Sequence, residues 1–486
     1  MLFWGFSMRD IVLVQPHEGA YNKIMKPWVP LSLLATSVKL EAEGYPITVI
    51  DQRVDPGWKH TLIRALERDP VCVGVTSMTG SQILGALEAS KLVKEHSRVP
   101  VVWGGVHATL FPEQTLEHEL VDVVIKGEGE ETFYQLVKRL EHGGPYDELA
   151  GVACKTTDGI LVNPDRSFLD PDTLPHPPYH LVNLEPYIHQ YFSEKRVIEV
   201  ESSRGCPHHC GFCYNLPYNK RTWRPLSPDR VVDRLALLMD RYGLTAFHFL
   251  DDAFFIDRGR ADGIMRRLID LKLELRLGFQ GIRVDTLARI SDAELDRLYQ
   301  AGGRFLQFGV ESGSPRILEM INKRIKVDEV ITLNRRLAKY PDLIPYYNFM
   351  CGFPTETKED LFQTTTLAWT LLKENRKALI SPFHHFKPYP GTPLADLILK
   401  DRYDYPKTLE EWGCFDWTEA QTQTQDPGAA RLFKRVELAS ILADGKMEAQ
   451  SDSPAFTALA KMYRPVARFR LSNNFYSMMP EAMLFR

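Results

Sequence analysis

The stretch RGCPHHCGFCYN (residues 204–215) carries three of the seven cysteines of this 486-residue chain, at positions 206, 210 and 213. A structural zinc site and an ordinary iron–sulfur cluster each use four protein ligands. Three thiolates on a four-iron cluster would leave one iron open to an exchangeable ligand. A zinc site would instead need His208 or His209 as a further ligand. The residues alone leave both interpretations open.

The cysteine stretch follows the first of six β-rich segments that alternate with helical patterns. Six β–α units in succession predict a barrel or a partial barrel. Active sites of such barrels are built at the C-terminal ends of the strands, which is where the cysteines would lie. The predicted strands are Val197–Ser202, Ala246–Asp251, Leu275–Gln280, Phe305–Glu311, Tyr346–Cys351 and Pro382–Lys387, and the predicted helices span about 228–241, 260–272, 291–301, 327–338 and 357–373.

An earlier alternating series occupies the N-terminal part of the chain. Continuous apolar strands separated by helices predict a parallel sheet covered on both faces, and five such strands predict a doubly wound, flavodoxin-like α/β domain. Ligands of such sheets bind beyond the carboxyl ends of the strands, where glycines and small residues recur in this sequence. Those residues are equally compatible with ordinary tight turns. The predicted strands are Asp10–Gln15, Ile47–Asp51, Val71–Ser77, Val99–Gly105 and Val121–Gly127.

The overall composition is that of a soluble globular protein, with 44% hydrophobic and 25% charged residues and a net charge of −4. The absence of a basic excess argues against nucleic-acid binding. No apolar window reaches the roughly 18 residues of a membrane span, and the N-terminus lacks the basic region of a signal peptide. An odd, clustered set of cysteines is typical of a reduced, intracellular protein, so we expect a cytoplasmic location.

The sequence CPHHCGFC resembles the CxxxCxxC signature of radical S-adenosylmethionine (SAM) enzymes. The resemblance implies that Cys206, Cys210 and Cys213 hold a 4Fe–4S cluster whose open iron chelates SAM. It also implies one-electron cleavage of SAM to a 5′-deoxyadenosyl radical, with an external electron donor of the flavodoxin or ferredoxin type. The same resemblance places SAM contacts at Phe212, Asp251, Asp252, Gln280, Arg283, Glu311, Ser312, Gly352, Phe353 and Pro354.

One SAM-binding segment departs from the family pattern. FHFLDD, which ends in Asp251 and Asp252, stands where the family usually has a GGE segment that contacts the SAM ammonium group. Two carboxylates can still accept hydrogen bonds from an ammonium. Loop capping is the structural alternative for this pair.

The segments PVVWGGVHATLFPE and VIKGEGEET resemble the cobalamin-binding domain that precedes the barrel in B12-dependent radical SAM proteins. The D-x-H-x-x-G motif of many B12 domains is absent, because QPHEGA has Gln15 and Ala20 at its ends. We therefore expect no histidine on cobalt and a lower face covered by the loop around Thr76–Gln82. The implied cobalamin contacts are Thr76, Ser77, Met78, Thr79, Gln82, Gly104, Gly105, Val106, His107, Gly127, Glu128 and Gly129.

The resemblance as a whole implies a C-methyltransferase that moves a methyl group from SAM, through methylcobalamin, to an unactivated carbon. A cobalamin-dependent cyclase or rearrangement enzyme that makes no methylated product is the first alternative. A methylthiotransferase would need three further gathered cysteines, whereas the remaining four are scattered singly. A non-enzymatic cobalamin sensor is the third alternative. The oligomeric state and the product's stereochemistry are not encoded in any pattern that we recognise.

These observations predict a cobalamin domain at 1–143, a Pro- and Asp-rich linker at 144–195, a radical SAM barrel at 196–395 and a C-terminal substrate or cover segment at 396–486. The linker carries one weak hairpin around Thr157–Gly159. Trp412, Phe415 and Trp417 hint at a large apolar or anionic substrate, although a natural product or a peptide is an equal candidate. The tail 461–486 has five Lys or Arg and one Glu, so it is either an anchor for an anionic, apolar partner or a packed terminus.

Overall fold

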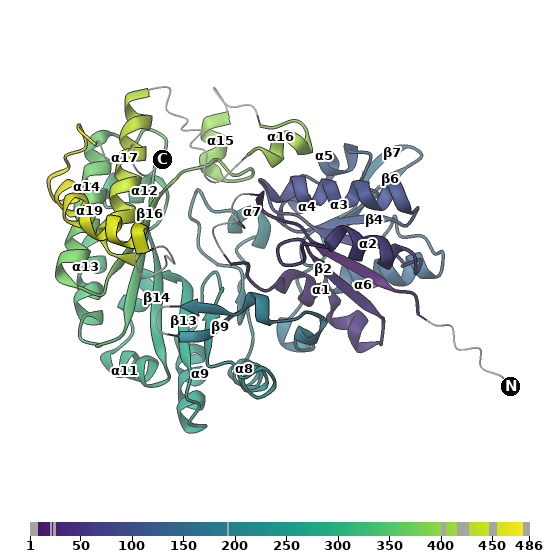
Figure 1. Cartoon of the computed structure of the whole chain (residues 1–486), viewed down its shortest axis with the longest axis horizontal. Coiled ribbons are helices and arrows are strands. Elements are labelled where there is room, and N and C mark those ends of the chain that lie inside the picture. Colours follow the sequence, from purple (N-terminus) through teal and green to yellow (C-terminus); the bar gives the residue numbers. More distant parts are fainter. Residues whose placement is uncertain are drawn as a thin grey trace. The chain divides into compact units, whose positions relative to one another are not determined.

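The computed structural model describes residues 8–19, 22, 26–191, 194–399, 405–415, 427–446 and 454–479. The chain forms two compact units (Figure 1). Among the described residues, the first unit contains those up to His189 and those between 404 and 419. The second unit contains those between 190 and 403 and those from 420 onward.

The first unit is built on a seven-stranded sheet in the order β2-β1-β3-β4-β5-β6-β7. The first five strands in that order pair in parallel, which confirms the predicted flavodoxin-like arrangement. Their carboxyl ends therefore share one edge of the sheet. These strands are β1 (Ile11–Gln15), β2 (Ile47–Asp51), β3 (Val73–Thr76), β4 (Val101–Gly104) and β5 (Val123–Ile125).

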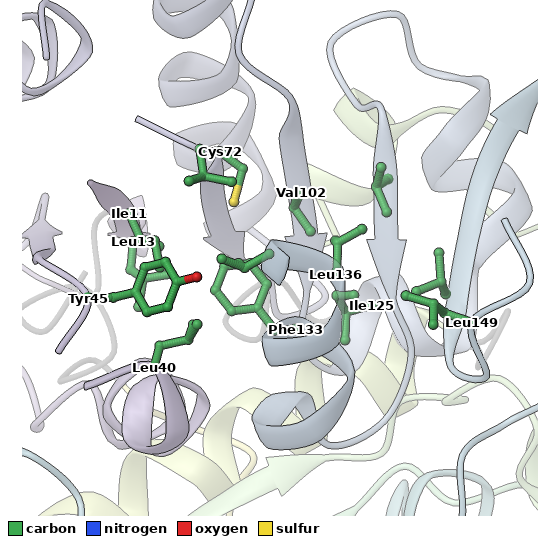
Figure 2. Packing of buried hydrophobic residues seen from close by; sticks show 14 of the residues in the cluster. Ile11, Leu13, Leu40, Tyr45, Cys72, Val102, Ile125, Phe133, Leu136 and Leu149 are labelled. Atoms are coloured by element: carbon green, nitrogen blue, oxygen red, sulfur yellow. The ribbon is translucent and has the colours of Figure 1, made fainter. Parts of the chain in front are cut away.

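A cluster of buried apolar side chains joins this sheet to its helices (Figure 2). Ile11 and Leu13 of β1 meet Leu40 of one helix and Phe133 of another, and all four are at most 2% exposed. Gly74 of β3 permits this approach, because a Cβ there would lie 2.8 Å from Leu13. The helices of this domain are α1 (Leu31–Ala42), α2 (Trp58–Leu66), α3 (Gln82–His96), α4 (Val106–Leu110), α5 (Pro112–Glu117) and α6 (Gly129–Glu141).

Most of the expected linker is folded onto the first unit. The predicted hairpin forms as β6 (Val152–Thr156) and β7 (Gly159–Val162), and β6 extends the sheet by pairing antiparallel with β5. Further along, Tyr187 Oη donates a 2.8 Å hydrogen bond to Asp51 at the end of β2. The intervening chain forms short 3-10 helices at Pro171–Thr173, Tyr179–Leu181 and Glu185–Tyr187.

The second unit contains a curled half-barrel sheet in the order β16-β15-β14-β13-β12-β9-β8. Its six long strands pair in parallel and in sequence order, as the partial barrel predicted. The strands are β8 (His189–Tyr191), β9 (Glu194–Val200), β12 (Ala246–Phe249), β13 (Arg276–Arg283), β14 (Gly303–Glu311), β15 (Ile344–Cys351) and β16 (Leu379–His385), and a two-stranded ribbon β10 (Ser203–Arg204)–β11 (Arg224–Pro225) stands apart.

Helices that alternate with the strands cover the sheet of the second unit (Figure 1). Several begin at side-chain caps, among which Ser291 and Thr357 form capping boxes. They are α8 (Pro228–Tyr242), α9 (Arg258–Asp270), α10 (Val284–Ala288), α11 (Asp292–Gln300), α12 (Pro315–Met320), α13 (Val327–Leu337) and α14 (Lys358–Glu374), while α7 (Asn215–Asn219) and α15 (Pro393–Leu399) lie in loops.

The C-terminal residues divide between the two units. In the second unit, α17 (Pro427–Ala443) runs along β16, where Ser440 accepts from Phe383 N and Asp444 accepts from Ile380 N at 2.8 Å. These bonds give two backbone N–H groups of β16, the edge strand of the half-barrel, a hydrogen-bond acceptor. A second helix, α19 (Pro454–Asn473), packs on α14 and α17. The short helix α16 (Leu409–Gly413) instead belongs to the first unit.

Candidate functional site

The cysteine loop lies between β10 and α7, at the C-terminal end of β9, as the sequence predicted. Gly205 has φ +78°, and a Cβ there would lie 2.1 Å from the carbonyl oxygen of Thr222. Gly211 anchors the middle of the loop, because its N–H donates to Ile321 and its carbonyl accepts from Leu394, both at 2.9 Å. Glycine is required where the backbone approaches so closely.

The structure brings Cys206, Cys210 and Cys213 close enough for their thiols to interact electrostatically. Burial raises the pKa of Cys206 and raises the pKa of Cys213 to about 12. Buried thiols with raised pKa values stay protonated until a metal displaces the protons. Within the described ranges, no three His, Cys, Asp or Glu side chains converge on a single ion position. Thiolates of a four-iron cluster each bind a different iron, so this donor set fits such a cluster.

Asp251 accepts hydrogen bonds through both carboxylate oxygens. Oδ1 accepts from Ser202 N at 2.8 Å, and Oδ2 accepts from the hydroxyls of Ser202 and Ser203. The guanidinium of Arg260 lies nearby, although burial dominates and raises the pKa of Asp251 to about 6. Asp251 therefore fixes the chain that leads into the cysteine loop, which is the capping role that the sequence left open.

Asp252 lies differently from its neighbour. Its carboxylate accepts from Gly205 N at 3.0 Å and from Tyr214 Oη at 3.4 Å, and it remains partly exposed. Its charge acts on both Cys206 and Cys213. Burial raises the pKa of Asp252. Of the two predicted carboxylates, Asp252 is the one that faces the cysteines and retains exposed surface.

A buried group of charges stands beside the second cysteine. Arg283, at the end of β13, donates from Nη1 to Cys210 Sγ at 3.4 Å and from Nη2 to the carbonyl of Lys323 at 2.6 Å. Lys323 Nζ pairs with Glu311 at 2.7 Å, and both side chains are at most 10% exposed. Although burial opposes it, the Glu311 carboxylate helps to raise the pKa of Lys323. This buried positive charge is therefore retained at neutral pH.

Lys323 is a site residue that the sequence did not reveal. Its ammonium lies 5.9 Å from the ring centre of Phe212, within the cysteine loop. Phe212 in turn lies 6.1 Å from Phe353. A lone lysine after a short helix gives no periodic or motif signal, but its place twelve residues after the strand-ending Glu311 was available in the sequence. The structure thus places Glu311 and Phe212 beside the Lys323 ammonium, with Arg283 on the Lys323 carbonyl and Phe353 beside Phe212.

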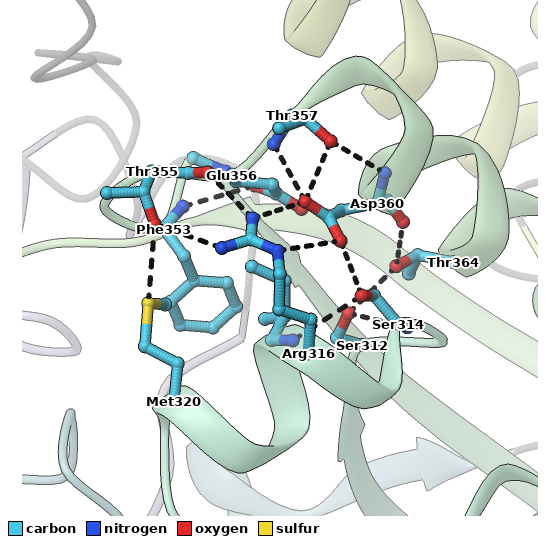
Figure 3. A network of polar contacts seen from close by, with 12 residues as sticks. Ser312, Ser314, Arg316, Met320, Phe353, Thr355, Glu356, Thr357, Asp360 and Thr364 are labelled. Atoms are coloured by element: carbon cyan, nitrogen blue, oxygen red, sulfur yellow. Dashed lines mark hydrogen bonds and ion pairs between the residues drawn. The ribbon is translucent and has the colours of Figure 1, made fainter.

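A polar network fixes the ends of β14 and β15 (Figure 3). Ser312 shares a 3.0 Å hydrogen bond with Thr364, and Ser314 donates to Asp360 at 2.6 Å. Arg316 pairs with the same aspartate. Ser312 is fully buried, so the network accounts for its polarity without a ligand.

Glu356 holds the turn Gly352–Pro354, which was predicted to contact SAM. Its Oε2 accepts from the backbone N–H groups of Gly352 and Phe353, the latter at 3.1 Å, and Pro354 follows. Gly352 has φ +79°, which favours glycine. Burial raises the pKa of Glu356 to about 7. The backbone of this turn is therefore positioned by one carboxyl group.

Gln280 lies on β13 directly before Gly281, whose φ is +68°. A Cβ at Gly281 would lie 2.2 Å from the carbonyl oxygen of Asp251, so β13 and the acidic pair are in close backbone contact. The Gln280 side chain is partly exposed at this rim. The structure thus brings Gln280 to the same rim as Asp252.

In the first unit, the loop after β3 and the glycines after β4 lie together. Ser77 donates to the Gly104 carbonyl from both its N–H at 2.8 Å and its hydroxyl at 3.1 Å. Gly105 has φ +95°, and a Cβ there would lie 2.6 Å from the backbone carbonyl oxygen of Ser77. The predicted residues Thr76, Gly104, Gly105 and Val106 therefore lie together, partly exposed, at the carboxyl edge of the sheet, and Ser77 is buried among them.

The remaining members of the predicted cobalamin set flank that surface. Gln82 Oε1 accepts from Met78 N at 2.7 Å, and the Met78 side chain is 44% exposed. Gly127 N donates to Thr109 at 2.9 Å, and Glu128 immediately precedes the first residue of α6, Gly129. Backbone without side chains at Gly104, Gly105 and Gly127 offers the close approach that a bulky ligand needs.

His107 is buried beneath α16, the C-terminal helix that belongs to the first unit. Its Nδ1 lies 3.2 Å from Thr79 Oγ1, and its ring centre lies 5.4 Å from that of Trp412. Burial lowers the pKa of His107 to about 3, so the ring is neutral. Its Nε2 has no hydrogen-bond partner among the described residues.

Trp412 belongs to the core of the first unit. It is fully buried and donates to Gln114 at 2.7 Å, and Phe415 beside it is 9% exposed. The burial of Trp412 and Phe415 supports a packing role for these two side chains, and their link to a substrate stays a prediction. Trp417 lies outside the described residues.

Comparison with known proteins agrees with this geometry. The family model of the Radical SAM superfamily matches residues 200–368, and that of the B12 binding domain matches residues 20–137. An uncharacterized methyltransferase of Pyrococcus horikoshii is 31% identical over 397 residues, which cover 81% of this chain and 83% of the relative. The chain belongs to the cobalamin-dependent radical SAM family.

Two further proteins are similar to this chain. An anaerobic magnesium-protoporphyrin IX monomethyl ester cyclase of Cereibacter sphaeroides is 29% identical over 419 residues, covering 82% of this chain and 65% of the relative. The structure of TsrM from Kitasatospora setae, a radical SAM methyltransferase with tryptophan and a SAM analogue bound, matches with a TM-score of 0.69 at 18% identity. The match covers 95% of this chain and 98% of TsrM. At that identity, the likeness establishes the shared fold.

Proposed function

We propose that this radical SAM protein is a cobalamin-dependent C-methyltransferase. The observation that carries the proposal is the joint presence of the three gathered cysteines on a half-barrel rim and a B12-binding unit whose glycine-lined edge is intact. When bound, the cluster and SAM supply a 5′-deoxyadenosyl radical, and cobalamin relays the methyl group from SAM to a carbon. The relatives include proteins named as methyltransferases and as cyclases, and the Pyrococcus horikoshii relative, at 31% identity, is named a methyltransferase.

Cys206, Cys210 and Cys213 would hold the cluster, and Asp252 would accept from the SAM ammonium group. Asp252 is the better candidate than Asp251 because its carboxylate is partly exposed and faces two of the cysteines. The buried pair Glu311–Lys323 and the Arg283 guanidinium would supply the charges around SAM and the cluster. Gln280 and the Gly352–Pro354 turn would line the nucleoside part, and Phe212 would border the cluster.

Cobalamin would lie at the edge formed by Thr76–Gln82, Gly104–His107 and Gly127–Gly129. We propose that no histidine ligates cobalt from below. His107 is packed under Trp412, with Nδ1 directed at Thr79, which supports a structural role for this ring. The partly exposed Met78 and its loop would cover the lower face instead.

The proposed substrate is a small molecule or a peptide, and the proposed electron donor is a flavodoxin or ferredoxin. The net charge of −4 supports a role without nucleic acid. None of the helices in the described part of the chain combines the length and the hydropathy that a bilayer crossing requires. A reduced compartment such as the cytoplasm suits an oxygen-sensitive cluster.

The test uses protein reconstituted anaerobically with iron, sulfide and cobalamin, together with a reductant and SAM that carries a trideuteriomethyl group. Metabolites extracted from a deletion strain are then searched for a compound that gains one labelled methyl group. Labelled product that requires Cys210 is expected, and Cys414→Ser is the matched control because Cys414 is an exposed, solitary cysteine. A Cys210-dependent product without the label would indicate a cyclase and contradict methyl transfer.

A further inference from the structure

The outer face of α19 carries a dense patch of exposed apolar side chains. Met462, Val466 and Phe469 are 63%, 38% and 55% exposed. They stand at positions i, i+4 and i+7, so they form one stripe along the helix. The opposite stripe, which includes Ala460, Ala467 and Leu471, is buried against the second unit. The helix is therefore fully packed on one side and still apolar on the other.

The chain after α19 extends this stripe. Arg470 donates to the carbonyl oxygens of Phe475 and Met478, the former at 3.0 Å, and it is buried while doing so. These bonds position the backbone of Phe475 and Met478, which are 44% and 70% exposed. The rings of Phe469 and Phe475 lie 6.3 Å apart, edge to face. Five exposed apolar side chains are thus held in a fixed array.

Other contacts brace the array against the body of the second unit. Arg435 of α17 donates to the carbonyl oxygens of Tyr476 and Ser477, at 2.8 and 3.2 Å. Thr365 of α14 hydrogen-bonds Asn474. The polar side chains that hold this segment in place are Thr365, Arg435, Arg470 and Asn474. Its exposed apolar residues therefore have defined positions. Figure 1 shows α19 in yellow beside α14 and α17.

The charged side chains of the segment itself have one sign. Residues 454–479 contain one lysine and three arginines and no Asp or Glu. Lys461 and Arg468 are exposed and flank the apolar stripe along one side of the helix, and Arg468 also donates from Nε to the Ala443 carbonyl at 2.9 Å. Apolar side chains beside exposed cations, on a helix lying on the surface of a folded unit, are the features of a segment that rests in the interface of an anionic bilayer.

We propose that the α19 face, defined as Met462, Val466, Phe469, Phe475 and Met478 with Lys461 and Arg468, docks the second unit on an anionic lipid surface. The apolar side chains enter the boundary between headgroups and acyl chains, and the two cations pair with lipid phosphates. The proposal is independent of the proposed reaction, because α19 contributes no residue to the cysteine loop.

Co-sedimentation with vesicles tests the proposal on the full-length protein. The two vesicle types are phosphatidylcholine alone and phosphatidylcholine mixed with phosphatidylglycerol. Binding to the anionic vesicles is expected, with weakening as salt screens the lysine and arginine charges. The double variant Met462→Gln, Phe469→Gln is expected to lose about tenfold or more in partitioning, because two exposed apolar side chains no longer enter the bilayer. Lys461→Gln is expected to weaken binding to the anionic vesicles alone.

The control is Leu271→Gln, which removes a side chain of similar exposure, 58%, at the end of α9. It is expected to bind as the unaltered protein does. Unchanged circular dichroism of all variants verifies folding. Equal sedimentation of the double variant and the unaltered protein, or no binding to anionic vesicles, overturns the proposal. It is also overturned if light scattering shows a dimer that the double variant converts to a monomer, since the face then joins two copies of this chain.

Discussion

The guanidinium of Arg283 lies 3.4 Å from the sulfur of Cys210, while its other terminal nitrogen binds the backbone of Lys323. Two buried cations thus border the second cysteine, and each has a carboxylate partner: Lys323 pairs with Glu311 at 2.7 Å and Arg283 pairs with Asp285 at 2.9 Å. Positive charge and hydrogen bonds to cluster sulfur stabilise the reduced form of an iron–sulfur cluster. The hydrogen bond from Arg283 to the Cys210 sulfur therefore favours the reduced form of a cluster that is bound here.

Arg283→Gln should make the cluster harder to reduce. We expect the equilibrium constant for one-electron reduction to fall about tenfold, which is 59 mV for one electron. Reduction followed by electron paramagnetic resonance measures this constant. Arg276→Gln, at the other end of β13, is the matched control. An unchanged potential with full iron content would show that Arg283 does not act on the cluster.

The two adjacent aspartates should separate in their effects. Asp251→Asn should lower the free energy of unfolding by about 2–4 kcal/mol, because it removes a buried carboxylate that faces Arg260 and two serines. Asp252→Asn should change stability little and should raise the KM for SAM. Thermal unfolding and SAM cleavage kinetics measure the two effects. Equal losses of stability in both variants would contradict the assignment of Asp252 to SAM.

Glu356 should make stability depend on pH between about 4.5 and 7. Its pKa rises from 4.5 to about 7 on folding, so the folded chain binds the proton more tightly than the unfolded chain. The stabilisation is complete below the unfolded value and is lost as the pH rises through 7. Glu356→Gln should flatten this slope, by roughly 2 kcal/mol over the interval after allowance for partial exposure. Urea unfolding at several pH values measures the slope, and an unchanged slope would contradict the raised pKa.

Trp412→Ala should destabilise the first unit although Trp412 is distant in sequence from its sheet. Loss of a fully buried tryptophan typically costs about 3–5 kcal/mol, and Gln114 also loses its partner. Hydrogen exchange should accelerate in α3, which packs on α16, and in α5, whose Gln114 accepts from Trp412, and it should remain unchanged in β14. Protection in α3 equal to that of the unaltered protein would show that α16 does not stabilise this unit.

Both sheets could be predicted from the sequence because their strands are continuous apolar runs bounded by turns and helices. The last strand is displaced, since the predicted strand begins at Pro382 whereas β16 starts at Leu379. A proline inside a strand is tolerated there because β16 lies at the end of the sheet. A local propensity cannot show which strand will be the outermost one.

The site residues that belong to a local sequence motif could be predicted. Those that join the site only through tertiary contacts could not. The cysteine spacing is local, so Cys206, Cys210 and Cys213 could be named from the sequence. Lys323 joins them only through the fold, and the sequence does not distinguish Asp251 from Asp252, because their difference arises from the Ser202–Ser203 segment. The docking of α16 on the first unit is likewise a long-range contact without a sequence signal.

The products made from SAM in a single anaerobic reaction test the central claim most directly. Protein reconstituted with iron, sulfide and cobalamin is given reductant and SAM, and S-adenosylhomocysteine and 5′-deoxyadenosine are quantified together. Both products are expected from the unaltered protein, and Cys210→Ala should abolish 5′-deoxyadenosine. Absence of 5′-deoxyadenosine, or its equal formation by Cys210→Ala, would contradict radical chemistry at the three cysteines, and absence of S-adenosylhomocysteine would contradict methyl transfer.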